Sequence, residues 1–474
     1  MSEPFVANAT PPEPTRARPP LRRETGAERL GNRVLAAILV CVVLVAPLPV
    51  GSNRGAAWML WALLIAALAV AYVVASWRGY GRLRLGGLPR SVVWLLVFFM
   101  LFAVVQLAPL MAYLPTGVAP LPGSVASVPP GISVAPAATI VAVLRFATGV
   151  VFLVLMLAVT RSRRRTQGIA WVLFLAVLVY AIWAILSLRY LGGTLFWGEK
   201  PGYSGVATGP FINRNSFATF LGMGAVLGLA LGLDQLHSAR HGAQHTHPWL
   251  GPRGMAFALS IVCVSVILVV QLATQSRMGV AATLVALSVV WGLSHRPGTS
   301  RVVLWLGLGG GALIAGLALI TQGAELADRL IVAEGDFDGR QALYRQVWQM
   351  ILARPLTGYG LDAFPAAFEL FHRPPVSAGV IWDNAHSSYL TLWVEMGLIV
   401  GSIPPLVALL IGLRLWRNLE TNRTLAAAAL GCLVLVGLHA TVDFSIEMQA
   451  NQFLLLAIVA IALRRAGVSH QSSR

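Results

Sequence analysis

Charged side chains are scarce in this chain. They account for 11% of its 474 residues, whereas hydrophobic residues account for 57%. Ordinary soluble domains carry about 25% charged residues, so the scarcity excludes a soluble globular protein. The hydrophobic content also excludes a disordered chain, because disorder needs low hydrophobicity and high charge. Since one membrane-spanning helix takes about 20 apolar residues, the length accommodates about twelve spans together with tails and loops.

Cysteine is rare and lysine is almost absent. Cys41, Cys263 and Cys432 each lie inside an apolar run, so they indicate neither a disulfide framework nor a metal site. We expect all three to be buried packing residues. Lys200 is the only lysine, and the net charge of +17 therefore comes from arginine. In a membrane protein such charge gathers in cytoplasmic loops, so it does not indicate nucleic-acid binding.

Nucleotide-binding signals are missing as well. The sequence has no G-x-x-x-x-G-K-[ST] loop and no strand pattern that could carry one. We therefore expect no nucleotide pocket, an ATP-independent activity and no cofactor.

The apolar segments predict an all-α integral membrane protein with about 12 transmembrane helices. The expected spans are 34–50, 56–76, 91–112, 137–160, 167–190, 215–233, 254–273, 279–294, 302–321, 387–413, 425–441 and 451–463. They divide the chain into a disordered cytoplasmic tail at 1–33, helices 1–9 at 34–321, a long outward loop at 322–386, helices 10–12 at 387–463 and a second cytoplasmic tail at 464–474.

Arginine alternates between the loops of this arrangement. The loops expected to face inward hold Arg78, Arg82, Arg84, Arg90, Arg161, Arg163, Arg164, Arg165, Arg240, Arg253, Arg296, Arg301, Arg414, Arg417 and Arg423. The outward loop 113–136 has neither lysine nor arginine. Because basic residues favour the cytoplasmic side of a membrane, the pattern predicts that both termini are cytoplasmic.

The long outward loop contains a predicted amphipathic helix from Gly339 to Arg354. Its apolar residues, Leu343, Val347, Met350 and Ile351, recur at helical spacing. Asp338 is a suitable N-cap, and Pro355 stops the helix. We expect this helix to lie against the membrane bundle or its surface.

Asp336 and Asp338 also form a D-x-D pattern of the kind found in metal-dependent glycosyltransferases. Three-residue acidic patterns arise often by chance, and Asp338 already has a capping role. We therefore favour capping over metal binding and expect no metal site.

Polar residues gather at the outward ends of the spans. The five groups are Asn213-Arg214-Asn215, Ser276-Arg277, Asn384-Ala385-His386-Ser387-Ser388-Tyr389, His439 with Asp443, and Arg145 within the fourth span. Arg340, Arg145, Glu395, Asn384, His439 and Asp443 are candidate supporting residues around a site.

Arg145 lies about nine residues into its span, and Glu395 lies at a similar depth in the tenth. A charge in mid-membrane costs about 2.5–3.5 kcal/mol even on the lenient insertion scale, so it must find a partner inside the bundle. We predict that Arg145 and Glu395 form an ion pair or share a cavity. Such a pair could serve the reaction or only lock two helices together.

Arg214 and Arg277 lie on the outward side, against the general trend of arginine in this chain. Guanidinium groups bind phosphate oxygens through two parallel hydrogen bonds. A lipid diphosphate at the outer face would explain both residues, and anchoring to ordinary lipid headgroups is the alternative.

Two histidines can take part in this chemistry. The ordinary pKa of histidine makes His386 a candidate general base, although a lone histidine at a helix start is also often structural. His439 and Asp443 are four residues apart, which places them on one helix face. Two ligands make a poor metal site, so we expect a hydrogen-bonded pair or a supporting role.

The chain resembles the O-antigen ligase and O-antigen polymerase superfamily of bacterial inner membranes. The resemblance runs from about Pro47 onward. It is carried by Pro49-Val50-Gly51-Ser52-Asn53-Arg54, Asn213-Arg214-Asn215-Ser216-Phe217-Ala218, Gln275-Ser276-Arg277-Met278-Gly279, Arg354-Pro355-Leu356-Thr357-Gly358-Tyr359-Gly360, Ala385-His386-Ser387-Ser388-Tyr389-Leu390, Glu395-Met396-Gly397 and the stretch from His439 to Phe444.

The resemblance implies a twelve-span inner-membrane fold with a large periplasmic loop at 322–386. It implies a metal-independent, inverting glycosyl transfer at the periplasmic face, from a glycan on undecaprenyl diphosphate to a sugar hydroxyl. By this likeness Arg214 and Arg277 hold the diphosphate and His386 is the base. Two positions depart from the family pattern: Ser387 replaces the usual asparagine and Met278 replaces a common glycine.

Some alternatives remain open at this point. The acceptor could be lipid A–core, as for a ligase, or another lipid-linked repeat unit, as for a polymerase. A transporter or flippase of lipid-linked oligosaccharides is the second functional class, but transporters favour internal repeats and broken helices with a site at mid-membrane. The sequence shows no repeat, and its polar groups gather at one face.

Overall fold

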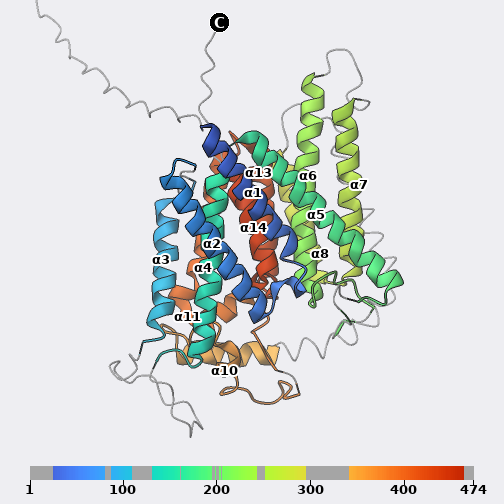
Figure 1. The fold of residues 1–474 in the computed structure, drawn as a ribbon. Coiled ribbons are helices and arrows are strands. Elements are labelled where there is room, and N and C mark those ends of the chain that lie inside the picture. Colours follow the sequence, from blue (N-terminus) through green and yellow to red (C-terminus); the bar gives the residue numbers. More distant parts are fainter. Residues whose placement is uncertain are drawn as a thin grey trace, which may run out of the picture.

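The computed structural model describes residues 25–80, 87–108, 131–160, 162–194, 198, 202–203, 205–242, 251–294, 341–379 and 381–463. Their regular structure is helical throughout, with no strand in these ranges. The helices are α1 (Gly26–Val45), η1 (Val50–Ser52), α2 (Gly55–Trp77), α3 (Arg90–Val105), α4 (Pro136–Val159), α5 (Arg163–Tyr190), α6 (Arg214–Gly242), α7 (Pro252–Ala273), α8 (Arg277–Ser294), α10 (Phe364–Phe368), α11 (Ser388–Gly401), α12 (Ile403–Asn418), α13 (Arg423–His439), η3 (Ser445–Glu447) and α14 (Gln449–Ala462). A further helix covers 341–353 (Figure 1).

The helices coincide with the expected spans wherever both can be compared. Every expected span overlaps a helix except 302–321, which lies outside the described residues. Among the residues that the structure describes, six helices, α2 and α4 to α8, are long and apolar enough to cross a membrane, and α11 with α12 makes a seventh if the two form one span. The shorter apolar helices are α3, α13 and α14. An all-helical membrane protein is thereby confirmed, whereas the number twelve stays a prediction.

The tenth expected span is not one straight helix. Residues 387–413 were expected to cross continuously, but α11 and α12 are bent by 66° relative to one another. Gly397 has φ 73° and leaves the helical conformation inside α11. Pro404 and Pro405 lack the N–H groups that would continue α11 into α12, and a proline is tolerated only in the first turn of a helix.

The first helix also begins earlier than expected. Residues up to 33 were expected to form a disordered tail, but α1 begins at Gly26. Thr25 and Glu28 form a capping box, in which each side chain accepts a hydrogen bond from the other residue's backbone N–H. This reciprocal bonding is the signal that starts the helix ahead of the apolar run.

The cysteines only partly match their expected burial. Cys432 is buried in α13, Cys263 is half-buried and Cys41 is exposed on α1. The prediction that all three are buried was wrong, because an apolar run supplies both the face of a helix that packs inside the bundle and the face that lies outside it. All three thiols are free.

Helix α6 is the centre of the bundle. In its most apolar stretch 94% of the residues are buried, against 17% in α2 at the periphery. Gly224 and Gly228 allow α5 to approach closely, since a Cβ on Gly224 would lie 2.6 Å from Cβ of Val177 and one on Gly228 would lie 2.7 Å from Cζ of Phe174. Small residues at such contacts are the usual means of close helix packing in membranes.

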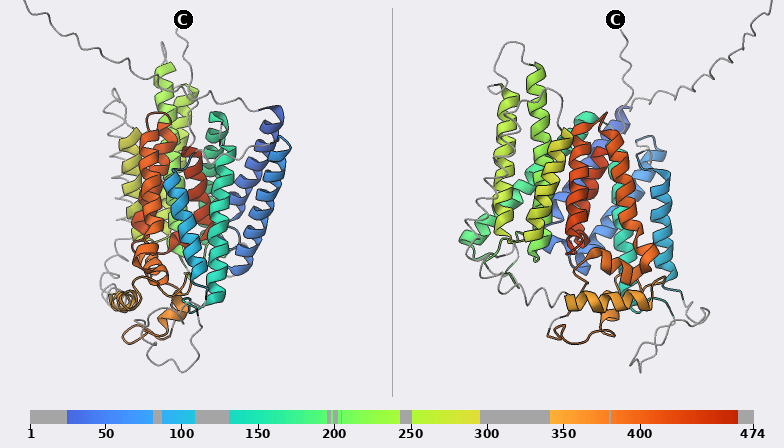
Figure 2. Two further views of the ribbon diagram at one scale, coloured as in Figure 1. Left: turned by 90° about the vertical axis from the view of Figure 1, so that its left-hand side faces the viewer. Right: turned by 180° about the vertical axis from the view of Figure 1, so that it is seen from behind.

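Within the described ranges, one end of the bundle collects the arginines that were expected to face inward. The end of α4 meets the end of α14 through Thr160 Oγ1 and Ala460 O, 3.4 Å apart. The end of α12 reaches the same place, where Asn418 Nδ2 donates to Ala462 O at 3.2 Å. We call this the arginine end; it is the upper end in Figure 1, and Figure 2 shows it from two further sides.

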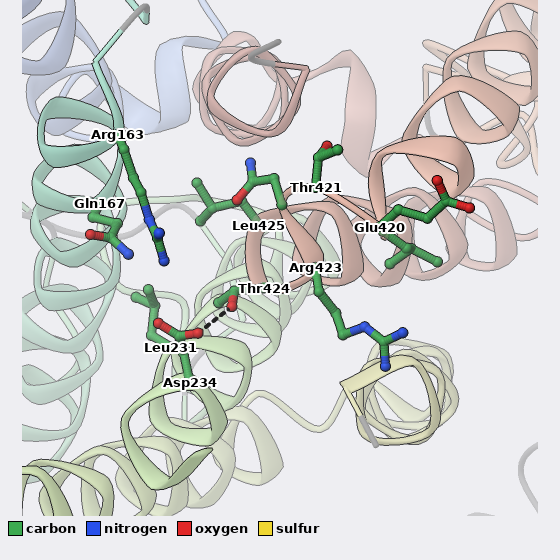
Figure 3. Close-up of a pocket in the computed structure, with 11 residues that line it drawn as sticks. Arg163, Gln167, Leu231, Asp234, Glu420, Thr421, Arg423, Thr424 and Leu425 are labelled. Atoms are coloured by element: carbon green, nitrogen blue, oxygen red, sulfur yellow. Dashed lines mark hydrogen bonds between the residues drawn. The ribbon is translucent and has the colours of Figure 1, made fainter. Parts of the chain in front are cut away.

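A polar cavity of about 480 Å³ lies at the arginine end, between α5, α6 and the connection from α12 to α13. Arg163, Asp234, Glu420 and Arg423 are among its lining residues, and Thr424 Oγ1 donates to Asp234 Oδ1 at 2.7 Å (Figure 3). Two basic and two acidic side chains balance one another here, so the cavity does not select one sign of charge.

The opposite end, which we call the site end, is covered by helix 341–353. This helix runs across the bundle ends (Figures 1 and 2). The expected apolar face of this helix is confirmed, because Leu343, Val347, Met350 and Ile351 are all fully buried. They pack with α10 and α11 in a small second core. Asp336, Asp338 and Arg340 lie outside the described residues.

The turn after this helix is fixed to the bundle by main-chain bonds. Tyr359 N donates to Val394 O at 3.0 Å, and Leu398 N donates to Pro355 O at 2.7 Å. The buried amide of Gln106, at the end of α3, donates to Thr357 O at 2.9 Å. The break in α11 at Gly397 exposes the backbone groups that these bonds require, so the bend and the turn depend on one another.

Candidate active site

Arg214 and Arg277 are the first residues of α6 and α8. Asn213 caps α6, since its Oδ1 accepts from the backbone N–H of Asn215 at 2.7 Å. Ser276 caps α8, accepting from the N–H three residues later at 3.3 Å. A helix N-terminus carries a partial positive charge, which adds to that of a guanidinium and favours an anion.

The starts of α6 and α8 pack against one another. The buried Nε2 of Gln271 donates to Ala218 O in α6 at 3.0 Å and to Gly279 O in α8 at 3.2 Å. A Cβ on Gly279 would lie 2.8 Å from Cβ of Ala218, so only glycine allows this approach. The fold therefore places Arg214 and Arg277 at the same end of the molecule, on neighbouring helices.

The two guanidinium groups differ in exposure. Arg277 is exposed, whereas Arg214 is half-buried with its Cζ 5.5 Å from the centre of the Tyr203 ring. An exposed and a half-buried cation at adjacent helix starts can approach an anion from two directions.

His439 and Asp443 lie beside the start of α6 but not on one helix face. Helix α13 ends at His439, so Asp443 lies in the turn beyond it, and the expected shared face was wrong. His439 Nδ1 is 2.6 Å from Thr219 Oγ1. Asp443 accepts from Asn215 Nδ2 at 2.8 Å and from the hydroxyl of Ser445. Asp443 thus holds the first turn of α6, next to Arg214, and His439 holds the second turn.

His386 lies just before α11 in a left-handed conformation, with φ 50°. A non-glycine residue in this region costs on the order of 1–3 kcal/mol, and such residues concentrate at functional sites. Its N–H donates to Asn384 Oδ1 at 3.0 Å, and its ring packs against Trp382 and Phe444, each with 5.7 Å between ring centres. Asn384 therefore helps to hold the backbone of His386 in this conformation.

The turn 440–445 connects His386 with the start of α6. Ser387 Oγ donates to Ala440 O at 3.3 Å, and Ser388 N donates to the same oxygen at 3.0 Å. Phe444 touches the His386 ring, while Asp443 binds Asn215. One short segment thus holds the histidine on one side and the arginine-bearing helix on the other.

Arg145 does not pair with Glu395. Its Nη2 lies 3.7 Å from Asp362 Oδ1, and its Cζ lies 4.7 Å from the centre of the Trp58 ring. Glu395 Oε1 instead accepts from the backbone N–H of Phe364 at 3.3 Å. The expected ion pair was therefore wrong, because the long loop inserts Asp362 beside Arg145. Arg145 and Glu395 do line the same cavity.

Two carboxyl groups of this region were missed from the sequence. Asp362 has its pKa raised by burial, against the lowering effect of the nearby Arg145, and Asp383 raises it further. Burial raises the pKa of Glu447 to about 7, although Ser388 Oγ donates to its Oε1 at 2.8 Å and so favours the charged form. The sequence did contain a signal for them, because acidic residues are scarce. The chain has only 18 of them, and Asp362 and Glu447 lie between the expected spans.

A metal site is not found in the part of the chain that the structure describes, where no three histidine, cysteine or acidic side chains are grouped to hold an ion. Asp336 and Asp338, the sequence-based candidates, lie outside that part.

Residues 261–404 match the family model described as O-antigen ligase. This part of the chain, 144 of its 474 residues, is therefore similar to O-antigen ligases. No curated protein matches the chain. The matched stretch includes Arg277, His386 and Glu395, together with the turn 356–360. The similarity supports a membrane glycosyltransferase-like role in polysaccharide biosynthesis.

Proposed function

We propose that this protein transfers a glycan from undecaprenyl diphosphate to an acceptor sugar hydroxyl, in the synthesis of a surface polysaccharide such as O-antigen or exopolysaccharide. The observation that carries this proposal is that the candidate diphosphate-binding arginines and the candidate base are held together at the site end. Arg214 and Arg277 begin two packed helices, and the turn that binds the first of these helices also holds His386.

The chemistry follows from these side-chain types. His386 accepts the proton of the acceptor hydroxyl as its oxygen attacks the anomeric carbon. The bond from that carbon to the diphosphate oxygen breaks, and the electron pair stays on the diphosphate. Arg214 and Arg277 stabilise the growing negative charge, which preorganised cations do well in a site with little water. Attack opposite the leaving group inverts the anomeric carbon, and the step needs neither a metal nor ATP.

The arrangement in the membrane is part of the proposal. We place twelve spans in the bacterial inner membrane, with both termini and the arginine end in the cytoplasm and the site end in the periplasm. The gathering of arginines at one end supports this orientation, because basic residues favour the cytoplasmic side.

The direct test uses purified protein in detergent with a lipid-diphosphate glycan donor and its acceptor. We expect His386→Gln to lower transfer by about 10²–10⁴-fold, the usual contribution of a general base. Arg277→Ala should cost about 10²–10³-fold, as for the loss of one charge-stabilising group. The matched controls are His372→Gln in the loop and Arg189→Ala, an exposed arginine at the end of α5. Near-normal transfer by both site variants would refute the assigned roles.

The same assay separates the alternative classes. Transfer in detergent, where no two compartments exist, distinguishes an enzyme from a flippase of lipid-linked oligosaccharides. Undiminished activity in excess chelator would exclude a metal-dependent transferase. A deletion strain decides between the two family activities: full-length polymer stranded on the carrier lipid indicates a ligase, and single repeats on the final acceptor indicate a polymerase.

A further inference from the structure

A second cavity, of about 360 Å³, lies between α3, α4, α11, α12, α13 and α14. Its walls are apolar over most of their length, with Phe99, Phe146, Leu153, Val407, Ile411 and Leu456 among the lining side chains. The volume falls within the range of about 300–1,000 Å³ that is usual for ligand pockets. We call it the acidic cavity because of its polar end.

The polar end has four carboxyl groups and one guanidinium. Asp362, Asp383, Glu395 and Glu447 line it together with Arg145, which is itself paired with Asp362. Among the residues that the structure places, no three such groups are arranged to hold a metal ion. The one guanidinium is already paired with Asp362, so the described residues of the polar end offer no free cation for a phosphate, whereas carboxyl oxygens accept hydrogen bonds from hydroxyl groups. The polar end therefore suits a neutral, hydroxyl-rich group.

The acidic cavity adjoins the candidate active site without containing it. Its lining includes Ser388 and Ala440 but none of Arg214, Arg277 and His386. Ser388 is two residues from His386, and its hydroxyl donates to Glu447 Oε1 at 2.8 Å. The turn 440–445, which binds the start of α6, thus separates the cationic helix starts from the carboxyl groups.

We propose that the acidic cavity binds the acceptor, a membrane-anchored glycolipid. Part of its hydrocarbon chain lies between α4, α12 and α14, and its neutral sugar lies at Asp362, Asp383 and Glu447. This inference rests on the proposed function. The donor belongs on the other side of the turn, because Arg214 and Arg277 attract its diphosphate, whereas the described lining of the acidic cavity has only Arg145, which is already paired with Asp362.

The test fills the apolar part of the cavity. Ala408 lines it from α12, whereas its neighbour Leu409 is exposed and does not line the cavity. In the purified system we expect Ala408→Trp to raise the KM for the glycolipid acceptor by about tenfold or more, equivalent to about 1.4 kcal/mol of lost binding. The KM for the donor should stay unchanged. Leu409→Trp, the matched control, should alter neither value.

A second acceptor makes the test independent of folding. A soluble acceptor with the same sugar but no hydrocarbon chain should react equally well with wild type and Ala408→Trp, which shows that the variant is folded. Asp383→Asn, at the polar end, should weaken both acceptors. An increase in the donor KM, or no change in either KM, would overturn the assignment of the cavity to the acceptor.

A binding measurement distinguishes failure of the cavity assignment from failure of the proposed function. If wild type transfers no glycan, the proposed function fails, and native mass spectrometry then measures binding alone. Retention of the glycolipid by wild type but not by Ala408→Trp would support the cavity as a glycolipid site. Equal retention by both proteins, or retention of phosphatidylethanolamine in preference to the glycolipid, would overturn it.

Discussion

Glu447 holds its carboxyl group among several charged and polar neighbours at the site end. Burial and the nearby Asp362 and Asp443 raise its pKa, whereas Ser388 and Arg145 lower it, and the result is about 7. The folded protein therefore keeps a proton on Glu447 at pH values where the unfolded chain has lost it. Its ordinary pKa is 4.5, so this difference affects stability between pH 4.5 and 7.

We expect the free energy of unfolding to fall as the pH rises through this window. The native state binds more protons than the unfolded state there, so the slope is negative. The total effect of Glu447 is at most on the order of 3 kcal/mol, since one pKa unit corresponds to about 1.36 kcal/mol. Glu447→Gln removes the titration, so its melting temperature in detergent should depend less on pH than that of wild type. Equal slopes for the two proteins would contradict the assigned pKa.

The sequence predicted that certain residues need an interaction partner, but it did not predict which residue that partner is. The cost of a buried charge required a partner for Arg145, and the sequence offered Glu395 at matching depth. The actual partner, Asp362, comes from a loop more than 200 residues away in the chain, and its position depends on how that loop folds back. For the same reason the hydrogen bond that Asn215 donates to Asp443 could not be derived from spacing.

At the scale of elements, the glycines of α6 decide how the bundle packs. A Cβ on Gly228 would clash with the ring of Phe174 on α5, whereas one on Gly292, in α8, would meet nothing within 4 Å. The two positions therefore form a matched pair of helical glycines with opposite surroundings.

We expect Gly228→Ala to destabilise the protein by about 1–3 kcal/mol, the usual cost of overpacking a core. Gly292→Ala should be neutral or stabilising by up to about 1 kcal/mol, since alanine favours a helix. Thermal unfolding of both variants in the same detergent measures the difference. Comparable melting temperatures for the two variants would show that α5 and α6 tolerate a wider separation.

Periodicity predicted some elements and not others. The apolar face of helix 341–353 was predictable because four apolar residues recur at helical spacing, and that face is buried in the structure. The bend between α11 and α12 was missed, although Gly397, Pro404 and Pro405 were visible in the sequence. Apolar runs reveal where a chain is buried. A kink is instead predicted by glycine, which lacks a Cβ, and by proline, which lacks a backbone N–H.

For the whole molecule, the distribution of charge predicts its orientation in the membrane. Glu420 lies at the arginine end and Ala378 in the loop at the site end, and both are exposed. In a background with the native cysteines replaced, Ala378→Cys should react with a membrane-impermeant maleimide in intact spheroplasts. Glu420→Cys should react only after permeabilisation. The reverse labelling pattern would invert the proposed orientation and place the site in the cytoplasm.

The last helix holds the first turn of α6 in place. In α14, Nδ2 of Asn451 donates to Ser216 O at 3.0 Å and to Ser445 O at 2.8 Å. The ribosome makes α14 more than 200 residues after α6. A nascent chain, or a product cut short by a premature stop codon, can therefore insert α6 while the first turn of this helix still lacks the bonds from Asn451. Under the proposed function, such a fragment would not consume lipid-linked precursors before α14 has been made.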